Sequence, residues 1–231
     1  MMDFEGYEWV FWEGTTVTIL VGLVSLPIAL VLGLFGAWAK LGGGPIIRAL
    51  AGAYTTAVRG IPELVLILLI YYGLTIIIQD AVSALTGSDE PVDLPRFATG
   101  TMTLGVIYGA FATEVFRGAY LAVDRGQIEA ARAYGMNRVL AFRRVVLPQM
   151  WRFALPGLGN LWLVLLKATA LVSVIQLPEL IRMTQIAVGA TREPFTFYFA
   201  ASLIYLAITA ASLLAIRSAE KHADRGVARR L

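Results

Sequence analysis

The sequence predicts an all-α membrane protein with five transmembrane helices. Hydrophobic residues make up 58% of its 231 residues and charged residues only 15%, whereas the apolar share of a typical soluble domain is roughly 45–50%. The mean hydropathy is +0.72, and long apolar runs recur along the chain. About 20 such residues suffice to cross a hydrocarbon core about 30 Å thick. One membrane domain over residues 1–231, with short loops, is therefore expected.

Five runs with few charges are the candidate spans, at about residues 14–39, 49–78, 97–118, 153–177 and 194–216. The second run holds Arg59, Pro62 and Glu63 near its start. Because proline breaks the helical hydrogen-bond ladder, this run is expected either to kink there or to begin as a separate short helix. A loop over residues 124–150 joins the third and fourth spans, and residues 217–231 form a tail.

The basic residues predict the orientation, because cytoplasmic loops hold lysine and arginine in excess. One set of segments contains Lys40, Arg48 and Arg59, the arginines between residues 117 and 152, and the basic tail. The opposite set has only Arg96, Arg182 and Arg192. The N-terminus is therefore expected outside, and loop 124–150 and the tail in the cytoplasm. The first 13 residues include no lysine or arginine, unlike a cleavable secretory signal, so the first span is expected to be retained.

The residue inventory excludes several kinds of chemistry. There is no cysteine and a single histidine, His222 in the tail, which excludes thiolate nucleophiles and cysteine-ligated metals. No acidic cluster has metal-ligand spacing, and no phosphate-binding loop of the nucleotide-hydrolysing type occurs. No metal and no nucleotide cofactor is therefore expected in this chain, and any nucleotide energy must come from another chain.

Loop 124–150 is predicted to form two short helices. Residues 127–134 suit the first, Gly135 is placed to end it with a positive φ, and Asn137 is an N-cap for a second helix over residues 138–146 that Pro148 terminates. The alanines at 130, 131 and 133 keep one side of the first helix slim, so it suits docking into a groove of another protein. A surface helical loop without a partner is the alternative.

The same residues resemble a known motif. Glu129, Ala130 and Ala131, then Gly135, then Leu147 and Pro148 resemble the EAA motif of ABC importer permeases, whose coupling helices seat on an ATPase. Val145 stands where that motif has isoleucine.

The stretches "RGIPELVLILLIYYGL" (59–74), "GVIYGAFATEVFRGAYLAV" (105–123) and "LLKATALVSVI" (165–175) extend the resemblance over nearly the whole chain. It is to the polar amino acid uptake family, with the closest likeness to the Q-type subunit of histidine/lysine/arginine/ornithine permeases; permeases for opines such as octopine and nopaline share the pattern.

The resemblance implies a type I ABC importer-like fold and a permease subunit for amino acids with basic side chains. It further implies a multi-pass protein of the bacterial inner membrane that works with a homologous M-type permease, two ATPase subunits and an extracytoplasmic amino acid-binding protein. ATP and Mg would be bound by the partner ATPase, and the coupling residues would be Glu129, Ala130, Ala131, Gly135, Leu147 and Pro148. Membrane lipid is expected to contact the chain, and no nucleic acid partner is expected.

Three charged residues lie at membrane depth, where charge is costly and marks a pathway or a pair: Glu63, Glu114 and Lys167. Lys167 is expected either to meet a substrate carboxylate or to pair with Glu114 or an acid of a partner chain. Glu63, after Pro62, is either a carboxylate for an ammonium group or a helix-start acid.

Glu114 and Arg117 are three residues apart and are expected to pair on one helix face. Hydroxyl and aromatic residues near these charges are second-rank pathway candidates: Thr169, Ser173 and Tyr71. Two interior acids against one lysine favour a cationic substrate.

Three other classes of function compete with an importer subunit. A membrane-embedded enzyme lacks the catalytic inventory. A self-contained secondary transporter would be expected to contain an internal inverted repeat. The similarity between "IPELV" at residue 61 and "LPELI" at residue 177 is too short to be evidence of such a repeat. A structural membrane subunit without a substrate site stays open.

Overall fold

The computed structural model describes residues 4, 6–87 and 91–223. The acidic residues Asp3, Glu5, Asp89 and Glu90 and tail residues 224–231 lie outside the described residues. Every regular element within them is helical: α1 (Glu8–Gly42), α2 (Pro45–Gly60), α3 (Glu63–Thr86), α4 (Arg96–Leu121), α5 (Arg125–Ala133), α6 (Arg138–Ala141), a π-helical segment (Phe142–Val146), α7 (Leu147–Ala168), a 3₁₀-helix (Thr169–Ile175), α8 (Leu180–Thr191) and α9 (Pro194–Ala223).

Four of these helical runs are long and apolar enough to cross a membrane: Glu8–Gly42, Glu63–Thr86, Arg138–Ile175 and Pro194–Ala223. Helix α4 and the short α5 meet at a bend of 58° and supply a fifth candidate when taken together. The prediction of an all-helical membrane protein is therefore confirmed, with four to five candidate spans within the described residues.

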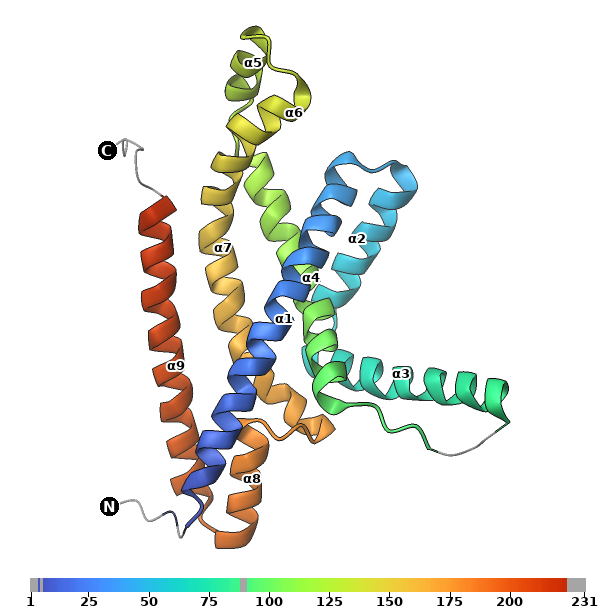
Figure 1. The fold of residues 1–231 in the computed structure, drawn as a ribbon, viewed down its shortest axis with the longest axis vertical. Helices are drawn as coiled ribbons and strands as arrows, with labels where there is room; N and C mark the ends of the chain where they lie inside the picture. The colour runs from blue at the N-terminus through green and yellow to red at the C-terminus, as the bar shows by residue number, and fades with distance from the viewer. Residues whose placement is uncertain (1–3, 5, 88–90, 224–231) are drawn as a thin grey trace.

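The second predicted span is divided at Pro62. Helix α2 ends at Gly60 and α3 begins at Glu63, with Ile61 and Pro62 in extended backbone between them. The residue before a proline is pushed out of the helical region, which is why the chain changes direction here. Figure 1 shows α3 leaving the end of α2 in a different direction and extending away from the other helices. Of the two alternatives, the separate short helix is the one observed.

Helix α1 packs on α4, and toward its N-terminal half on α7 and α8, through a row of small residues. Its buried positions are Gly14, Thr18, Gly22, Ser25, Ala29, Gly33 and Ala37, together with the valines Val10 and Val21. Spacings of three and four residues place the small side chains on one face, and small residues let helix backbones approach closely in a membrane. A Cβ added at Gly33 would lie 2.4 Å from the Cβ of Ala112 on α4, so no larger side chain fits there.

Helix α4 is the centre of the fold. It contacts α1, α2, α3 and α7, and the fully or nearly buried large side chains on it include Leu104, Ile107, Tyr108 and Phe116. Tyr54 ties α2 to it by donating a hydrogen bond to the carbonyl of Val106. The polar groups in the middle of α4, such as those of Tyr108 and Thr113, are therefore buried against its neighbours.

The basic segments gather at one end of the molecule. The α1–α2 connection, helices α5 and α6, and the C-terminal end of α9 lie at the top of Figure 1, whereas α8 and the N-terminal end of α1 lie at the bottom. This arrangement agrees with the orientation predicted from lysine and arginine. We call the end with α5 and α6 the inner end and the end with α8 the outer end.

Candidate functional site

A cavity of about 390 Å³ lies between α2, α4 and α7. Its polar lining residues are Arg59, Tyr108, Glu114 and Asn160, and its apolar ones are Phe111, Val115, Gly157, Leu161 and Val164. A mainly apolar cavity with a few convergent polar groups is the usual form of a small-molecule site. We call it the polar cavity.

Glu63 joins the polar cavity through Tyr108. The hydroxyl of Tyr108 donates to the carboxylate of Glu63 and lies 3.2 Å from both of its oxygens. Tyr108 is buried on α4, and Glu63 is the first residue of α3, directly after the break at Pro62. The break therefore places a half-buried carboxylate beside the cavity wall, where an ammonium or guanidinium group would find an acceptor.

Arg59 supplies the opposite charge; in the sequence it served to predict the orientation and the helix break but was not predicted as a site residue. Its guanidinium lies over the ring of Phe111, 5.6 Å from the centroid, and both residues line the polar cavity. Arg59 is in the last turn of α2, four positions before Glu63. The signal that would have found it is a basic and an acidic residue on either side of a helix break.

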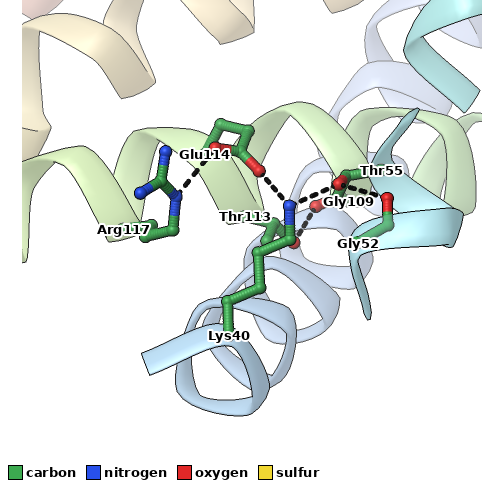
Figure 2. Close-up of polar contacts among 7 residues, drawn as sticks. All are labelled: Lys40, Gly52, Thr55, Gly109, Thr113, Glu114 and Arg117. Carbon is green, nitrogen blue, oxygen red and sulfur yellow. Dashed lines mark hydrogen bonds and ion pairs between the residues drawn. The ribbon is translucent and has the colours of Figure 1, made fainter. Parts of the chain in front are cut away.

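The inner side of the cavity is closed by an ion-pair network around Glu114 (Figure 2). One carboxylate oxygen accepts from Lys40 Nζ of α1 at 2.5 Å, and the other from Arg117 Nε at 2.9 Å. Lys40 also donates to the hydroxyl of Thr55 on α2. The Lys40 and Glu114 side chains are only 16% and 19% exposed. The network joins α1, α2 and α4, and we call it the inner knot.

The inner knot decides between two expectations for Glu114. The predicted pair with Arg117 is confirmed. The alternative pair of Glu114 with Lys167 is wrong, because Lys40 and Arg117 occupy the two carboxylate oxygens. Sequence reasoning missed Lys40, since it lies 74 residues from Glu114 along the chain.

Lys167 lies in the last turn of α7 and is exposed. It shares a helix face with Gly157, Asn160 and Val164, because the spacings are three, four and three residues. Those three residues line the polar cavity, so Lys167 lies one turn beyond the cavity on the same face. Its ammonium therefore extends that face toward the outer end.

The second-rank candidates lie outside the polar cavity. The hydroxyl of Thr169 is buried and donates to the carbonyl of Leu166 at 2.7 Å, which is the bond back to the helix that hydroxyls in spans commonly make. Ser173 is buried in the 3₁₀-helix. Tyr71 is half-buried and packs edge-to-face on Tyr72, with ring centroids 5.3 Å apart. None of these three side chains is among the residues that line the described cavities.

The loop at the inner end has the predicted turn. Gly135 has φ +79°, and the amides of Met136 and Gly135 donate to the carbonyls of Ala131 and Arg132, a pattern that ends a helix at a left-handed glycine. The side-chain oxygen of Asn137 accepts from the amide of Leu140 at 2.9 Å. Both the Gly135 and the Asn137 predictions are confirmed.

The surface of the loop is more apolar than its arginines suggest. Glu129, Ala130 and Gly135 are exposed, and Tyr134 and Val139 are 87% and 76% exposed. Ala131, in contrast, is buried at 4% exposure. Besides its exposed arginines, the loop therefore offers Glu129, small residues and two large side chains to another molecule, whereas Ala131 packs within the loop.

Pro148 does not end the second helix, so that prediction is wrong. Helix α6 continues through the π-helical segment into α7, with Pro148 in the first turn of α7. The amide of Leu147 donates to the carbonyl of Phe142, five residues earlier. A π-turn widens the helix by one residue, and it lies where the proline would otherwise interrupt the ladder. Leu147 is 39% exposed beside it.

A second buried polar cluster, which we call the outer knot, was missed. Glu179 is fully buried, and its carboxylate accepts from the amides of Ile181 and Arg182 at 2.9 and 2.8 Å and from the hydroxyl of Tyr205 at 3.3 Å. It caps α8, and the amide of Leu180 donates to Thr18 of α1. Burial raises the pKa of Glu179 to about 7. An acid directly before residues 180–191 was the available N-cap signal.

The chain is similar to a known family and to several known proteins. The family described as "Binding-protein-dependent transport system inner membrane component" matches residues 12–229. The octopine transport system permease protein OccQ of Rhizobium radiobacter is 45% identical over 97% of this chain and 94% of its own length. The histidine/lysine/arginine/ornithine transport system permease protein HisQ of Salmonella typhimurium is 44% identical over 97% of both chains.

A solved structure is also similar. An amino acid ABC transporter crystallised with histidines matches with a TM-score of 0.82 and 32% identity, over 96% of this chain and 99% of that one.

Proposed function

The chain belongs to the family of binding-protein-dependent transport system inner membrane components, and we propose that the polar cavity is its substrate site. As a member of this family it is a multi-pass inner-membrane permease subunit of an ABC importer, a transport subunit rather than a catalytic one. Such a system works with an ATPase and a binding protein.

We propose that the substrate is an amino acid with a basic side chain. The observation that carries this proposal is the opposite charge on the two sides of one cavity: Arg59 lines it, and Tyr108 holds Glu63 at its edge. A guanidinium suits a carboxylate, which it can bind through two hydrogen bonds, and a carboxylate suits an ammonium or guanidinium group. The substrates in the name of the HisQ relative have these groups.

Glu114 has a different role in this proposal. Its two oxygens are already bonded to Lys40 and Arg117, so it is a weak acceptor for a further cation. It instead adds negative potential at the inner side of the cavity while holding α1 and α4 together. Glu63 accepts from the Tyr108 hydroxyl and takes part in no ion pair among the described residues, so it is the carboxylate that is open to a substrate.

An opine is the second candidate, and Lys167 favours it. Lys167 lies one turn of α7 beyond the cavity on the same face, so that a substrate with a second carboxylate would find a second cation. The OccQ relative has octopine in its name and is 45% identical. Thr169, Ser173 and Tyr71 stay second-rank candidates, because none of them lines the described cavities.

The open face of α7 and the loop at the inner end define the expected partners. Asn160, Val164 and Lys167 form a polar and partly exposed face that one subunit cannot close, and we propose that a homologous M-type permease covers it. We further propose that Glu129, Ala130, Gly135 and their neighbours seat on one of two ATPase subunits, which bind ATP and Mg.

Closure of the ATPases would move the α5–α6 loop and rock the two permease halves between inward and outward access. In this arrangement Ala131 supports the loop from within, and Leu147 and Pro148 connect it to α7 through the π-turn.

The test is ATP-dependent uptake by the complex reconstituted in liposomes, with labelled arginine, lysine, histidine, ornithine and octopine. Arg59→Gln and Glu63→Gln are expected to lower uptake of basic amino acids at least tenfold while the ATPases still co-purify. The exposed Arg96→Gln and Glu8→Gln serve as matched controls and should leave uptake near wild type. Normal uptake by both cavity variants would place the substrate site elsewhere.

Lys167→Met separates the two substrate classes. If the substrate is an opine held by two cations, this change should abolish octopine uptake and leave arginine uptake largely intact. Loss of complex assembly instead would mean that Lys167 pairs with an acid of a partner chain. Deleting residues 127–136 should abolish uptake of every substrate, and uptake that survives this deletion would contradict the coupling role of the loop.

A further inference from the structure

Two adjoining apolar hollows lie at the inner end of α1, separate from the polar cavity. One, of about 320 Å³, is lined by Ala37, Phe116, Phe142 and Met150 among others. The other, of about 480 Å³, lies along the exposed face of α1 and is lined by Val31 and Phe35. Both are lined by Leu34 and Trp38, so the two hollows meet at these side chains. We call the pair the α1 groove.

The α1 groove and the polar cavity use different residues of α4. Phe116 and Tyr120 face the groove, whereas Tyr108, Phe111, Glu114 and Val115 line the cavity. The groove includes no charged side chain among its lining residues. Its only polar side-chain groups are the indole N–H of Trp38 and the hydroxyl of Tyr120, which suits hydrocarbon chains rather than a polar solute.

Trp38 marks the depth of the groove in the membrane. Its side chain is 65% exposed, and its indole nitrogen would lie 3.8 Å from a Cβ added at Gly42, one turn nearer the inner end of α1. The ring therefore directs its polar edge toward the inner surface. Tryptophan and tyrosine gather at the boundary between hydrocarbon and headgroups, so the groove opens at that boundary.

Two arginines lie close along the chain to residues that line the groove. The guanidinium of Arg48 donates to the carbonyl of Gly43 at 3.4 Å, next to the lining residue Gly42. Arg138 lies four residues before Phe142, and the amide of Phe142 donates to the carbonyl of Arg138, so it is one turn closer to the inner surface on the same face. Both arginines are exposed. Within the described residues, the ion pairs involve Glu114 and not these two guanidinium groups.

We propose that the α1 groove binds one anionic diacyl phospholipid of the cytoplasmic leaflet. Its two acyl chains occupy the two hollows, and its phosphate contacts Arg48 and Arg138. Charge complementarity selects this occupant: two exposed guanidinium groups outside the ion pairs of the described residues lie near the inner end of apolar hollows, on the side where the headgroups of an anionic leaflet lie. The partner permease is expected on the other side of α4, at the polar cavity, and so leaves this groove to lipid.

Quenching of Trp38 by brominated lipid tests the proposal. The complex is placed in nanodiscs of phosphatidylcholine that contain increasing fractions of either dibrominated phosphatidylglycerol or dibrominated phosphatidylcholine. Subtracting the signal of a Trp38→Phe complex isolates Trp38 from the other tryptophans. Half-maximal quenching is expected at a several-fold lower fraction of the anionic lipid than of the zwitterionic one.

Arg48→Gln and Arg138→Gln should each weaken this preference by about fivefold, because a basic residue near an anionic surface contributes about that factor. Arg217→Gln is the matched control: it is an exposed arginine at the inner end of α9 and should leave the preference unchanged.

Equal quenching by the two lipids would overturn the proposal, since it would show ordinary lipid contact without a site. Absence of quenching by either lipid would overturn it as well and would show that a protein partner covers the groove. An Arg217→Gln effect as large as that of Arg48→Gln would show a general surface potential instead of a site.

Discussion

The inner and outer ends of this permease each hold a buried carboxylate, but they stabilise it in different ways. At the inner end, Glu114 is bonded to two cations, Lys40 and Arg117. At the outer end, Glu179 is fully buried and is bonded to two backbone amides and the hydroxyl of Tyr205, with no cation within ion-pair distance among the described residues. Both knots connect α1 to a neighbouring helix.

The difference shows how a buried acid is tolerated in a membrane protein. Taking a carboxylate out of water costs several kcal/mol, and a paired cation or hydrogen bonds must offset the cost. Where cations are present, the acid stays charged, and removing one of its partners lowers the stability of the fold. Where they are absent, burial raises the pKa, as it does for Glu179 to about 7, and the acid responds to pH instead.

The largest effect is expected from Lys40→Met at the inner knot. The change leaves Glu114 with Arg117 alone and removes the bond to Thr55, so the free energy of unfolding should fall by about 3 kcal/mol. Reversible unfolding in mixed micelles measures it. The double variant Lys40→Met/Glu114→Gln should be less destabilised than Lys40→Met, because the undercompensated carboxylate is gone and the cation left behind, Arg117, is 39% exposed to solvent; additive losses would contradict the ion-pair account.

The outer knot should respond to pH. The pKa of Glu179 is about 7 in the folded protein, above the value near 4.3 of an unfolded chain. Between these values the folded state holds a proton that the unfolded state has lost, so stability falls as pH rises. From pH 5 to pH 7 the loss should be about 2 kcal/mol.

In Glu179→Gln this dependence should disappear, whereas Glu193→Gln, an exposed acid, should retain it. Thermal unfolding midpoints across this pH range provide the measurement. An unchanged pH slope in Glu179→Gln would show that other groups cause it.

Two glycines with positive φ, one in the inner loop and one after α3, allow a further comparison. Gly135 at the inner end has φ +79°, and Gly87, which follows α3, has φ +69°, each with no atom within 4 Å of an added Cβ. Alanine at either position should cost about 1 kcal/mol of local stability, because a Cβ disfavours the left-handed region.

Only Gly135→Ala, however, should also lower ATP-coupled uptake, since it lies in the loop proposed to seat on the ATPase. Hydrogen exchange of residues 125–141 and transport assays would check this. Equal transport loss in Gly87→Ala would argue for a general folding defect.

The smallest effect should come from Arg117→Gln. Arg117 is 39% exposed and pairs with Glu114 within one helix, and such pairs contribute about 0.5 kcal/mol or less. Its unfolding free energy should therefore stay close to wild type, and added salt should reduce the difference further. A loss comparable to that of Lys40→Met would mean that the two cations share the charge equally.

The turn of the inner loop followed from sequence because it depends on neighbours in the chain. Gly135 and Asn137 act within a few residues of themselves, and both were found where the residue types predict them. The prediction that Pro148 ends the second helix was wrong for a related reason. The preference of proline is local, but a π-turn is an alternative that packing selects, and here α6 and α7 form one continuous run.

The polar cavity was only partly predictable. Glu63 and Glu114 stand out in the sequence because they are acids in apolar runs, and both lie at or beside the cavity. Arg59 was not predicted as a site residue, because basic residues near a membrane surface are already explained by the orientation of the chain. Lys167, singled out as a charge within an apolar run, lies one turn of α7 beyond the cavity on the same helix face, but the choice of partner for Glu114 depended on how α1 crosses α4.

The sequence by itself determined the membrane class, the helical fold, the family resemblance and the turn of the inner loop, because hydropathy, helix capping and motif spacing are properties of short stretches of chain. Only the tertiary structure decided that Lys40 rather than Lys167 meets Glu114, that Arg59 and Glu63 flank one cavity, and that Glu179 is buried without a cation. These depend on which helix faces meet, and a row of small residues on α1 sets that meeting by letting two backbones approach closely.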